Sequence, residues 1–147
     1  MGFGKLLSVT DISASGLSAE RTRMEVVANN ISNANSTQTP EGGPFRRKEV
    51  VFASAVQNAF GVFKGNVDEL SGVRVVGIQS DSSELPVIYR PGHPEANQEG
   101  YVTMPNVSLP EEMVDLVTAS RSYEANLRAL KTFRDMVEQA LSLLRGR

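Results

Sequence analysis

The last third of this 147-residue chain repeats apolar side chains at alternating steps of four and three residues. Such a spacing keeps one face of a helix turned toward a partner, and over about five heptads it is the condition for a coiled coil. We therefore predict one helix over residues 109–144. At about 1.5 Å per residue it would be about 54 Å long, which is too long to bury inside a small globular monomer. Nine of the eleven positions are apolar or aromatic, and the positions are Leu109, Met113, Leu116, Ser120, Tyr123, Leu127, Leu130, Arg134, Val137, Leu141 and Leu144.

The first third repeats the same spacing and supplies a partner helix. Its positions are Phe3, Leu7, Thr10, Ala14, Leu17, Arg21, Met24, Ala28 and Ile31. We predict a helix over about residues 5–34 that pairs with the C-terminal helix as a coiled coil and brings the chain ends together. Apolar surface left over on such a pair is a candidate for packing against other copies. A plain two-helix core that covers a central sheet remains the alternative.

The middle of the chain reads as strands and turns. All seven prolines lie between residues 40 and 110, so helix breakers are concentrated there. The predicted strands are Lys48–Ala53, Val73–Gln79, Pro86–Tyr89 and Tyr101–Met104, the last two joined as a hairpin with a long loop. We expect an α+β fold with an N-terminal helical segment (1–35), a small central β segment (36–108) and a C-terminal helical segment (109–147).

Composition excludes several classes of function. A formal net charge of −2 gives no field that would favour nucleic acid as a partner. The absence of cysteine excludes disulfides, thiolate metal sites and a cysteine nucleophile. No window approaches the roughly 20 apolar residues of a membrane span, and no secretory signal begins the chain, so we expect no membrane insertion. If the protein acts outside the cytoplasm, it must leave by a route that needs no cleaved signal.

Few side chains suggest catalysis. His93 is the only histidine and lies between prolines on a predicted loop, where a role in the turn is the default interpretation. Asp81 and Glu84 resemble an acid and base pair, but such a pair needs a cleft that separates the two pKa values. We predict no enzyme, cofactor or metal, and keep as a rival a small periplasmic hydrolase that would depend on these two carboxylates.

Asparagine is concentrated where the first helix should end, in the run Asn29–Asn35. Asparagine terminates helices and bonds to nearby backbone. The run is interpreted either as a frayed helix end or as a polar junction between the N-terminal helix and the rest of the chain, where neighbouring subunits could be registered.

Several segments resemble a known family. Residues 15–21 and 30–35 resemble the N-terminal signature of the bacterial flagellar rod and hook proteins. Further motifs resemble the proximal rod protein C family of the flagellar basal body. They are Tyr89, residues 91–94, 99–102, 105–107, 111–113 and 121–126. Two departures lie in the predicted hairpin, where Arg90 replaces a usually acidic residue and Thr103 and Met104 replace a lysine–aromatic pair.

The resemblance implies a structural subunit of the rod that spans the periplasm. It implies export through the flagellar type III apparatus, polymerisation with other rod subunits and adjacent basal-body components, and transmission of torque. It further implies that the paired terminal helices form an inner tube and that the central β segment packs outside them.

The apolar seams and the asparagine run supply candidates for the subunit interface. These candidates are Leu17, Met24, Asn30, Ile31, Asn33, Met113, Leu116, Tyr123, Leu127 and Leu130. The alternative function is a free-standing coiled-coil adaptor, which would share the helices but form a discrete oligomer in solution.

Overall fold

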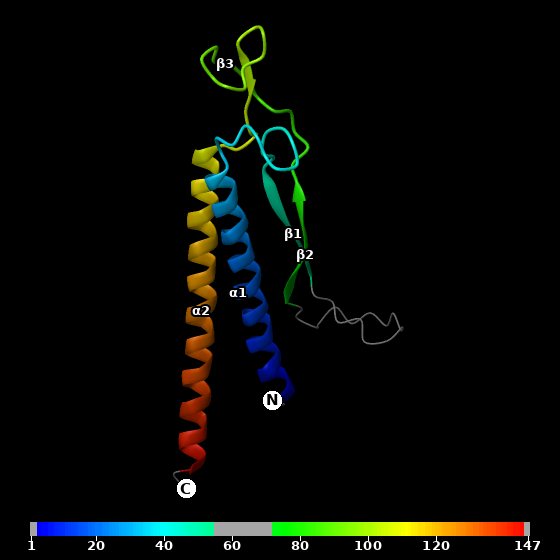
Figure 1. The fold of residues 1–147 in the computed structure, drawn as a ribbon. Coiled ribbons are helices and arrows are strands. Elements are labelled where there is room, and N and C mark those ends of the chain that lie inside the picture. Colours follow the sequence, from blue (N-terminus) through cyan, green and yellow to red (C-terminus); the bar gives the residue numbers. More distant parts are fainter. Residues whose placement is uncertain (1–2, 55–71, 146–147) are drawn as a thin grey trace, which may run out of the picture.

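A computed structural model describes residues 3–54 and 72–145 of the chain. The described elements are α1 (Phe3–Ser32), β1 (Lys48–Ser54), β2 (Val73–Ser80), β3 (Val87–Tyr89), β4 (Tyr101–Thr103) and α2 (Leu109–Arg145). The molecule is elongated, because two long helices run beside each other and two small β ribbons are attached to them (Figure 1). The predicted α+β class is confirmed, and the predicted helix bounds agree with the structure to within about two residues.

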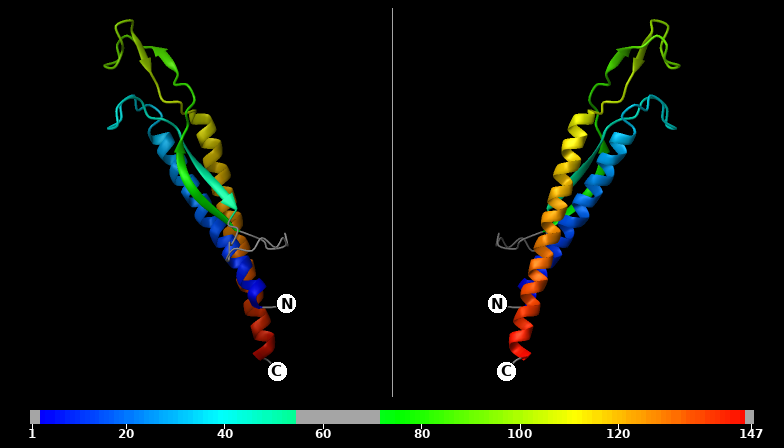
Figure 2. Two further views of the ribbon diagram at one scale, coloured as in Figure 1. Left: turned by 90° about the vertical axis from the view of Figure 1, so that its right-hand side faces the viewer. Right: turned by 90° about the vertical axis from the view of Figure 1, so that its left-hand side faces the viewer.

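The two helices are antiparallel, so α1 begins and α2 ends at the same end of the molecule (Figures 1 and 2). With 30 residues in α1 and 37 in α2, the helices are about 45 Å and 55 Å long. The last turns of α2 therefore extend past the start of α1, as Figure 1 shows. The predicted pairing of the terminal helices is confirmed, while a supercoiled geometry stays a prediction.

Strands β1 and β2 form an antiparallel ribbon that lies along α1 (Figure 1). The register pairs Lys48 with Ser80 and Ser54 with Val73, and it shifts between Val51 and Phe52. Near the far end of the ribbon, the backbone N–H of Val73 donates to the hydroxyl of Ser15 in α1 at 3.0 Å. The ribbon is thus held to α1 by side chains of the helix itself.

Strands β3 and β4 form the predicted hairpin, which projects beyond the end of the helix pair (Figures 1 and 2). The rings of Tyr89 and Tyr101 meet edge to face with centroids 5.3 Å apart. Gly100 adopts a φ of +85° beside this pair, and a Cβ there would lie 2.8 Å from the Tyr89 ring. Glycine is therefore required at the turn into β4.

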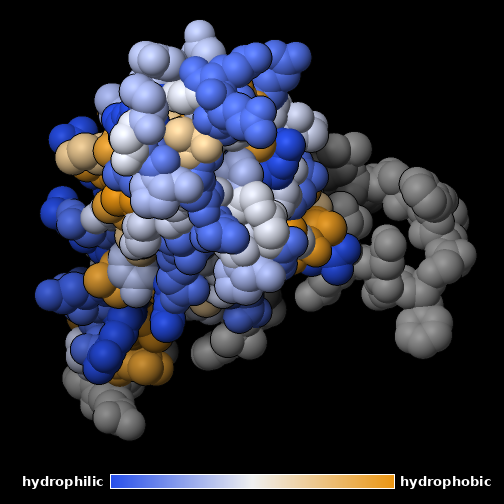
Figure 3. Space-filling view, turned by 45° about the horizontal axis from the view of Figure 1, so that its top comes forward, coloured by the Kyte–Doolittle hydropathy of each residue, from blue (hydrophilic) through white to orange (hydrophobic). Residues whose placement is uncertain are grey.

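The buried core is small and lies toward the end where α1 finishes and α2 begins. Its apolar members are Ala19, Val26, Val27, Ala34, Phe45, Val102, Met104 and Ala119. Most of them have small side chains, so the helices and ribbons meet over a thin layer. Apolar side chains consequently interrupt the polar surface in several places (Figure 3).

Candidate functional site

The predicted seam of α2 divides between two faces of the helix. Leu116, Tyr123 and Leu130 are half-buried on the side of α1. Met113 and Leu127, which alternate with them in the predicted spacing, are 61% and 51% exposed. The prediction that one seam holds all five residues against the partner helix was therefore wrong.

Four residues, each one position before a predicted seam residue, face α1 instead. Glu112 and Ala119 have no exposed surface, and Asn126 and Phe133 are half-buried. Two of these four side chains are polar and one is alanine, so only Phe133 among them carries a strong apolar signal in the sequence. Because an α-helix has 3.6 residues per turn, residues three and four positions from Leu116 both flank its face, so packing decides whether Glu112 or Met113 turns inward.

The corresponding residues of α1 follow a similar division. Leu17, Met24 and Ile31 are half-buried, whereas Ala14 and Ala28 are exposed. At Gly16 the two helices approach closely, because a Cβ at this position would lie 2.9 Å from the side-chain nitrogen of Asn126. Gly16 and Asn126 thus meet in the seam between the helices, where the apolar spacing predicted the adjacent residues Leu17 and Leu127.

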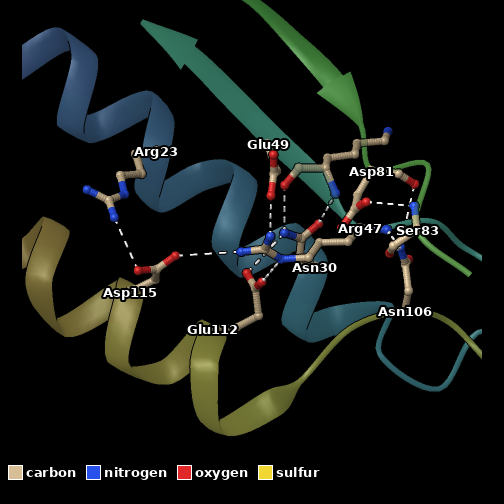
Figure 4. Close-up of polar contacts among 10 residues, drawn as sticks. Arg23, Asn30, Arg47, Glu49, Asp81, Ser83, Asn106, Glu112 and Asp115 are labelled. Atoms are coloured by element: carbon tan, nitrogen blue, oxygen red, sulfur yellow. Dashed lines mark hydrogen bonds and ion pairs between the residues drawn. The ribbon is translucent and has the colours of Figure 1, made fainter.

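Asn30 joins three elements at the end of α1. Its Nδ2 donates to the carbonyl oxygen of Lys48 at 2.9 Å and to Oε2 of Glu112 at 3.0 Å. Its Oδ1 accepts from the backbone N–H of Lys48 at 2.9 Å. Asn30 is 1% exposed, so α1, β1 and α2 are tied by one buried amide (Figure 4). The polar-junction interpretation of the asparagine run applies within the chain at this residue.

Glu112 is the second centre of this junction. Its Oε1 accepts from Nε of Arg47 at 2.5 Å, and Arg47 also pairs with Glu49 and, at 3.7 Å, with Asp115. Asp115 accepts in addition from Arg23 of α1 at 3.1 Å. The hydrogen bond to Glu112 raises the pKa of Arg47 above its ordinary value, although burial acts in the opposite direction. The charge on Glu112 is therefore balanced inside the fold (Figure 4).

A neighbouring cluster fixes the loop that leads into α2. Asn106 accepts from the backbone N–H of Arg47 at 2.8 Å and donates to the hydroxyl of Ser83 at 2.7 Å. Asp81 accepts from the backbone N–H of Ser83 at 2.8 Å. Hydrogen bonds from the backbone and side chain of Ser83 lower the pKa of Asp81. The Asp81 carboxylate thus stabilises the turn at residues 81–83 (Figure 4).

The other candidates from the sequence also lie in turns. Nδ1 of His93 accepts from the backbone N–H of Glu95 at 3.2 Å, and the Glu84 side chain is exposed. Asn33 donates to the carbonyl oxygen of Asn29 at 2.9 Å and accepts from Ser36 at 3.2 Å, as expected where a helix ends. Among residues 3–54 and 72–145, no group of three acidic or histidine side chains is arranged to hold a metal ion. Neither of the two described helices is long and apolar enough to cross a bilayer.

A groove opens between the start of α1 and the last third of α2. Its volume is about 880 Å³. Its apolar lining comes from Leu127, Leu130, Phe133 and Val137, and Thr10 contributes from α1. The groove continues the helix seam toward the end of the molecule at which α1 begins, so the two helices leave apolar surface open there.

Comparisons with known proteins identify the family. Residues 11–38 match the family model "Flagella basal body rod protein", and residues 98–143 match "Flagellar basal body rod FlgEFG protein C-terminal". The flagellar basal-body rod protein FlgC of Borreliella burgdorferi is 41% identical over 96% of this chain and 99% of its own length. The chain belongs to the FlgC family.

Two further FlgC proteins are similar to this chain over nearly their whole length. That of Salmonella typhimurium is 41% identical over 94% of this chain and 97% of its own length, and that of Bacillus subtilis is 39% identical over 90% and 94%. The chain is therefore a structural protein of the flagellar basal-body rod and not an enzyme. The matched segments contain most of α1 and, at the other end, β4 and nearly all of α2.

Proposed function

We propose that this subunit polymerises into the rod through the faces of α1 and α2 that their own pairing leaves exposed. The observation that carries the proposal is a row of apolar side chains on α2 that remain exposed beside the contact with α1. Leu109, Met113, Val117 and Leu127 lie within about one quarter of the helix circumference and are 41%, 61%, 52% and 51% exposed. Large exposed apolar patches mark interaction sites.

The junction around Asn30 and Glu112 supports the same proposal in a different way. It ties α1, α2 and β1 into one unit by buried polar bonds rather than by a large apolar core. The apolar side chains of the helices are thereby left for contacts between subunits. Leu17, Met24, Ile31, Leu116, Tyr123 and Leu130 are half-buried in the pair, and their role in a subunit interface, like that of Asn30 and Asn33, stays a prediction.

Torque transmission follows from this mode of assembly. A patch on one subunit that binds a different patch on the next generates an open helical array. Extended helix contacts distribute the load over many side chains, which suits a drive shaft. We also propose assembly with other rod subunits and basal-body components, and export through the flagellar type III apparatus; both rest on family membership. Under this proposal, residues 1–35 and 109–147 serve as axial helices and residues 36–108 pack outside them.

Polymerisation by the purified chain tests the proposal. We expect sedimentation velocity to show species that grow with protein concentration, and electron microscopy to show open-ended filaments or short helical arcs. A coiled-coil adaptor would instead form one discrete oligomer at all concentrations. A single closed oligomer that does not grow would contradict the proposed function.

A further inference from the structure

The β3–β4 hairpin is covered only in part by its own fold, because Val102 of β4 is 1% exposed. Val87, Ile88 and Tyr89 of β3 are 59%, 40% and 61% exposed, and Tyr101 of β4 is 43% exposed. Side chains of successive strand residues point to opposite faces. Val87, Tyr89 and Tyr101 share the open face, whereas Ile88 lies opposite the buried Val102 on the other face. The open apolar face is therefore a candidate for contact with an external surface.

The β1–β2 ribbon offers an uncovered apolar surface of its own. Phe52, Val76 and Ile78 are 40%, 58% and 53% exposed. The ribbon lies beside α1, whereas the hairpin projects past the end of the helix pair, and within the described residues the two do not pack on each other (Figure 1). The hairpin of one molecule therefore cannot cover the ribbon of the same molecule.

The two surfaces carry opposite charge. Between residues 84 and 103 the hairpin segment has three carboxylates and one guanidinium, from Glu84, Glu95, Glu99 and Arg90. The ribbon and its approaches (46–54 and 72–81) have four cations and two carboxylates. Arg47 and Glu49 pair with each other in the internal junction, which leaves Arg46, Lys48 and Arg74 against Asp81. Arg74 and Glu99 are exposed, and neither forms an ion pair with another described residue.

We propose that the β3–β4 hairpin of one subunit docks on the β1–β2 ribbon of a second copy of this chain. Apolar side chains meet at the centre and the acidic hairpin faces the basic ribbon, an arrangement that selects partner and register. The contact joins two different surfaces, so it leaves a free hairpin and a free ribbon at the ends and propagates. The inference rests on the proposed polymerisation and identifies a second contact within it, outside the helix pair.

Cysteine cross-linking tests this contact, because the natural chain contains no cysteine. Rods are isolated from cells that make only the variant Tyr89→Cys/Ile78→Cys, and are then oxidised. We expect a disulfide-linked dimer and longer ladders. The matched controls are the two single variants and Tyr89→Cys/Leu127→Cys, which places the second cysteine on the exposed face of α2. The controls should give at least tenfold less cross-linked dimer.

Charge exchange provides a second measurement on the same cysteine background. Glu99→Lys and Arg74→Glu should each lower the cross-link yield about two- to fivefold, and the two together should restore it, since an exposed ion pair contributes up to about 1 kcal/mol. Normal rods without the Tyr89–Ile78 cross-link would overturn this inference and leave the proposed polymerisation intact. Capture of a different protein by the hairpin cysteine would overturn the choice of a second copy. If the variant forms no rods, the concentrated purified variant is oxidised instead. The absence of a disulfide-linked dimer in that experiment would overturn the proposal.

Discussion

Nε of Arg47 lies 2.5 Å from Oε1 of Glu112, a carboxylate that has no exposed surface. The two residues are 65 positions apart, and their contact closes the end of the helix pair against β1. A buried charge is tolerated only when it is paired and hydrogen-bonded. Loss of Arg47, the cationic partner of Glu112, should therefore destabilise the isolated subunit.

Removal of Arg47 tests this dependence. Arg47→Met should lower the free energy of unfolding by about 3–5 kcal/mol, because Glu112 would be left buried without its cation. The double variant Arg47→Met/Glu112→Leu should recover much of that loss, measured by urea unfolding of the purified chain. A change below about 0.5 kcal/mol in the single variant would show that the pair does not support the fold.

The close approach at Gly16 gives a prediction of opposite sign. Gly16→Ala/Asn126→Ala should raise the free energy of unfolding by about 1 kcal/mol, because alanine favours a helix over glycine and the atoms nearest the new Cβ are removed. Gly16→Leu alone should destabilise the chain, since the side chain would force the helices apart. Both are read from thermal unfolding, and a stabilising Gly16→Leu would contradict the close approach.

The turn at Asp81 predicts a dependence on pH. Its pKa is lowered from 3.8 by the hydrogen bonds from Ser83. A lowered pKa contributes stability above the unfolded-state value, and that stability is lost as the pH falls from about 3.8 through the folded-state value. Asp81→Asn should remove this part of the acid dependence, seen by comparing unfolding at pH 6 with unfolding at pH 2–4. An unchanged pH profile would exclude the stabilising role of the turn.

Much of the fold could be predicted from the sequence because its signals are local. The four-three spacing predicted both helices, and the turn residues after Tyr89 predicted the hairpin. The inward positions of α2 could not be predicted, because Glu112, Ala119 and Asn126 lack the apolar character that marks a seam. The asparagine run indicated a junction at Asn30, yet its partners Lys48 and Glu112 are 18 and 82 positions away and no local pattern connects them.

Leu127 and Leu130 both line the groove beside α1, but Leu127 is 51% exposed whereas Leu130 is half-buried on the inward side. Leu130→Asp should therefore block rod assembly and also weaken the pairing of α2 with α1, while the central β segment stays folded. Far-UV circular dichroism and limited proteolysis of the purified chain measure the loss at the helix ends. If both helices resist proteolysis as well as in the natural chain, or if cells that make only this variant build normal rods, the placement of Leu130 is contradicted.

Leu127→Asp separates rod assembly from folding, because the side chain is 51% exposed and the change should leave the isolated subunit intact. The measurement is the yield of rods in basal bodies purified from cells that make only this variant, together with the unfolding curve of the purified chain. Thr132→Asp, another exposed position on α2, is the matched control. We expect no rods for Leu127→Asp, normal rods for the control, and unfolding free energies within about 0.5 kcal/mol of the natural chain for both. Normal rods built from Leu127→Asp would contradict the assignment of the exposed apolar row of α2 to assembly.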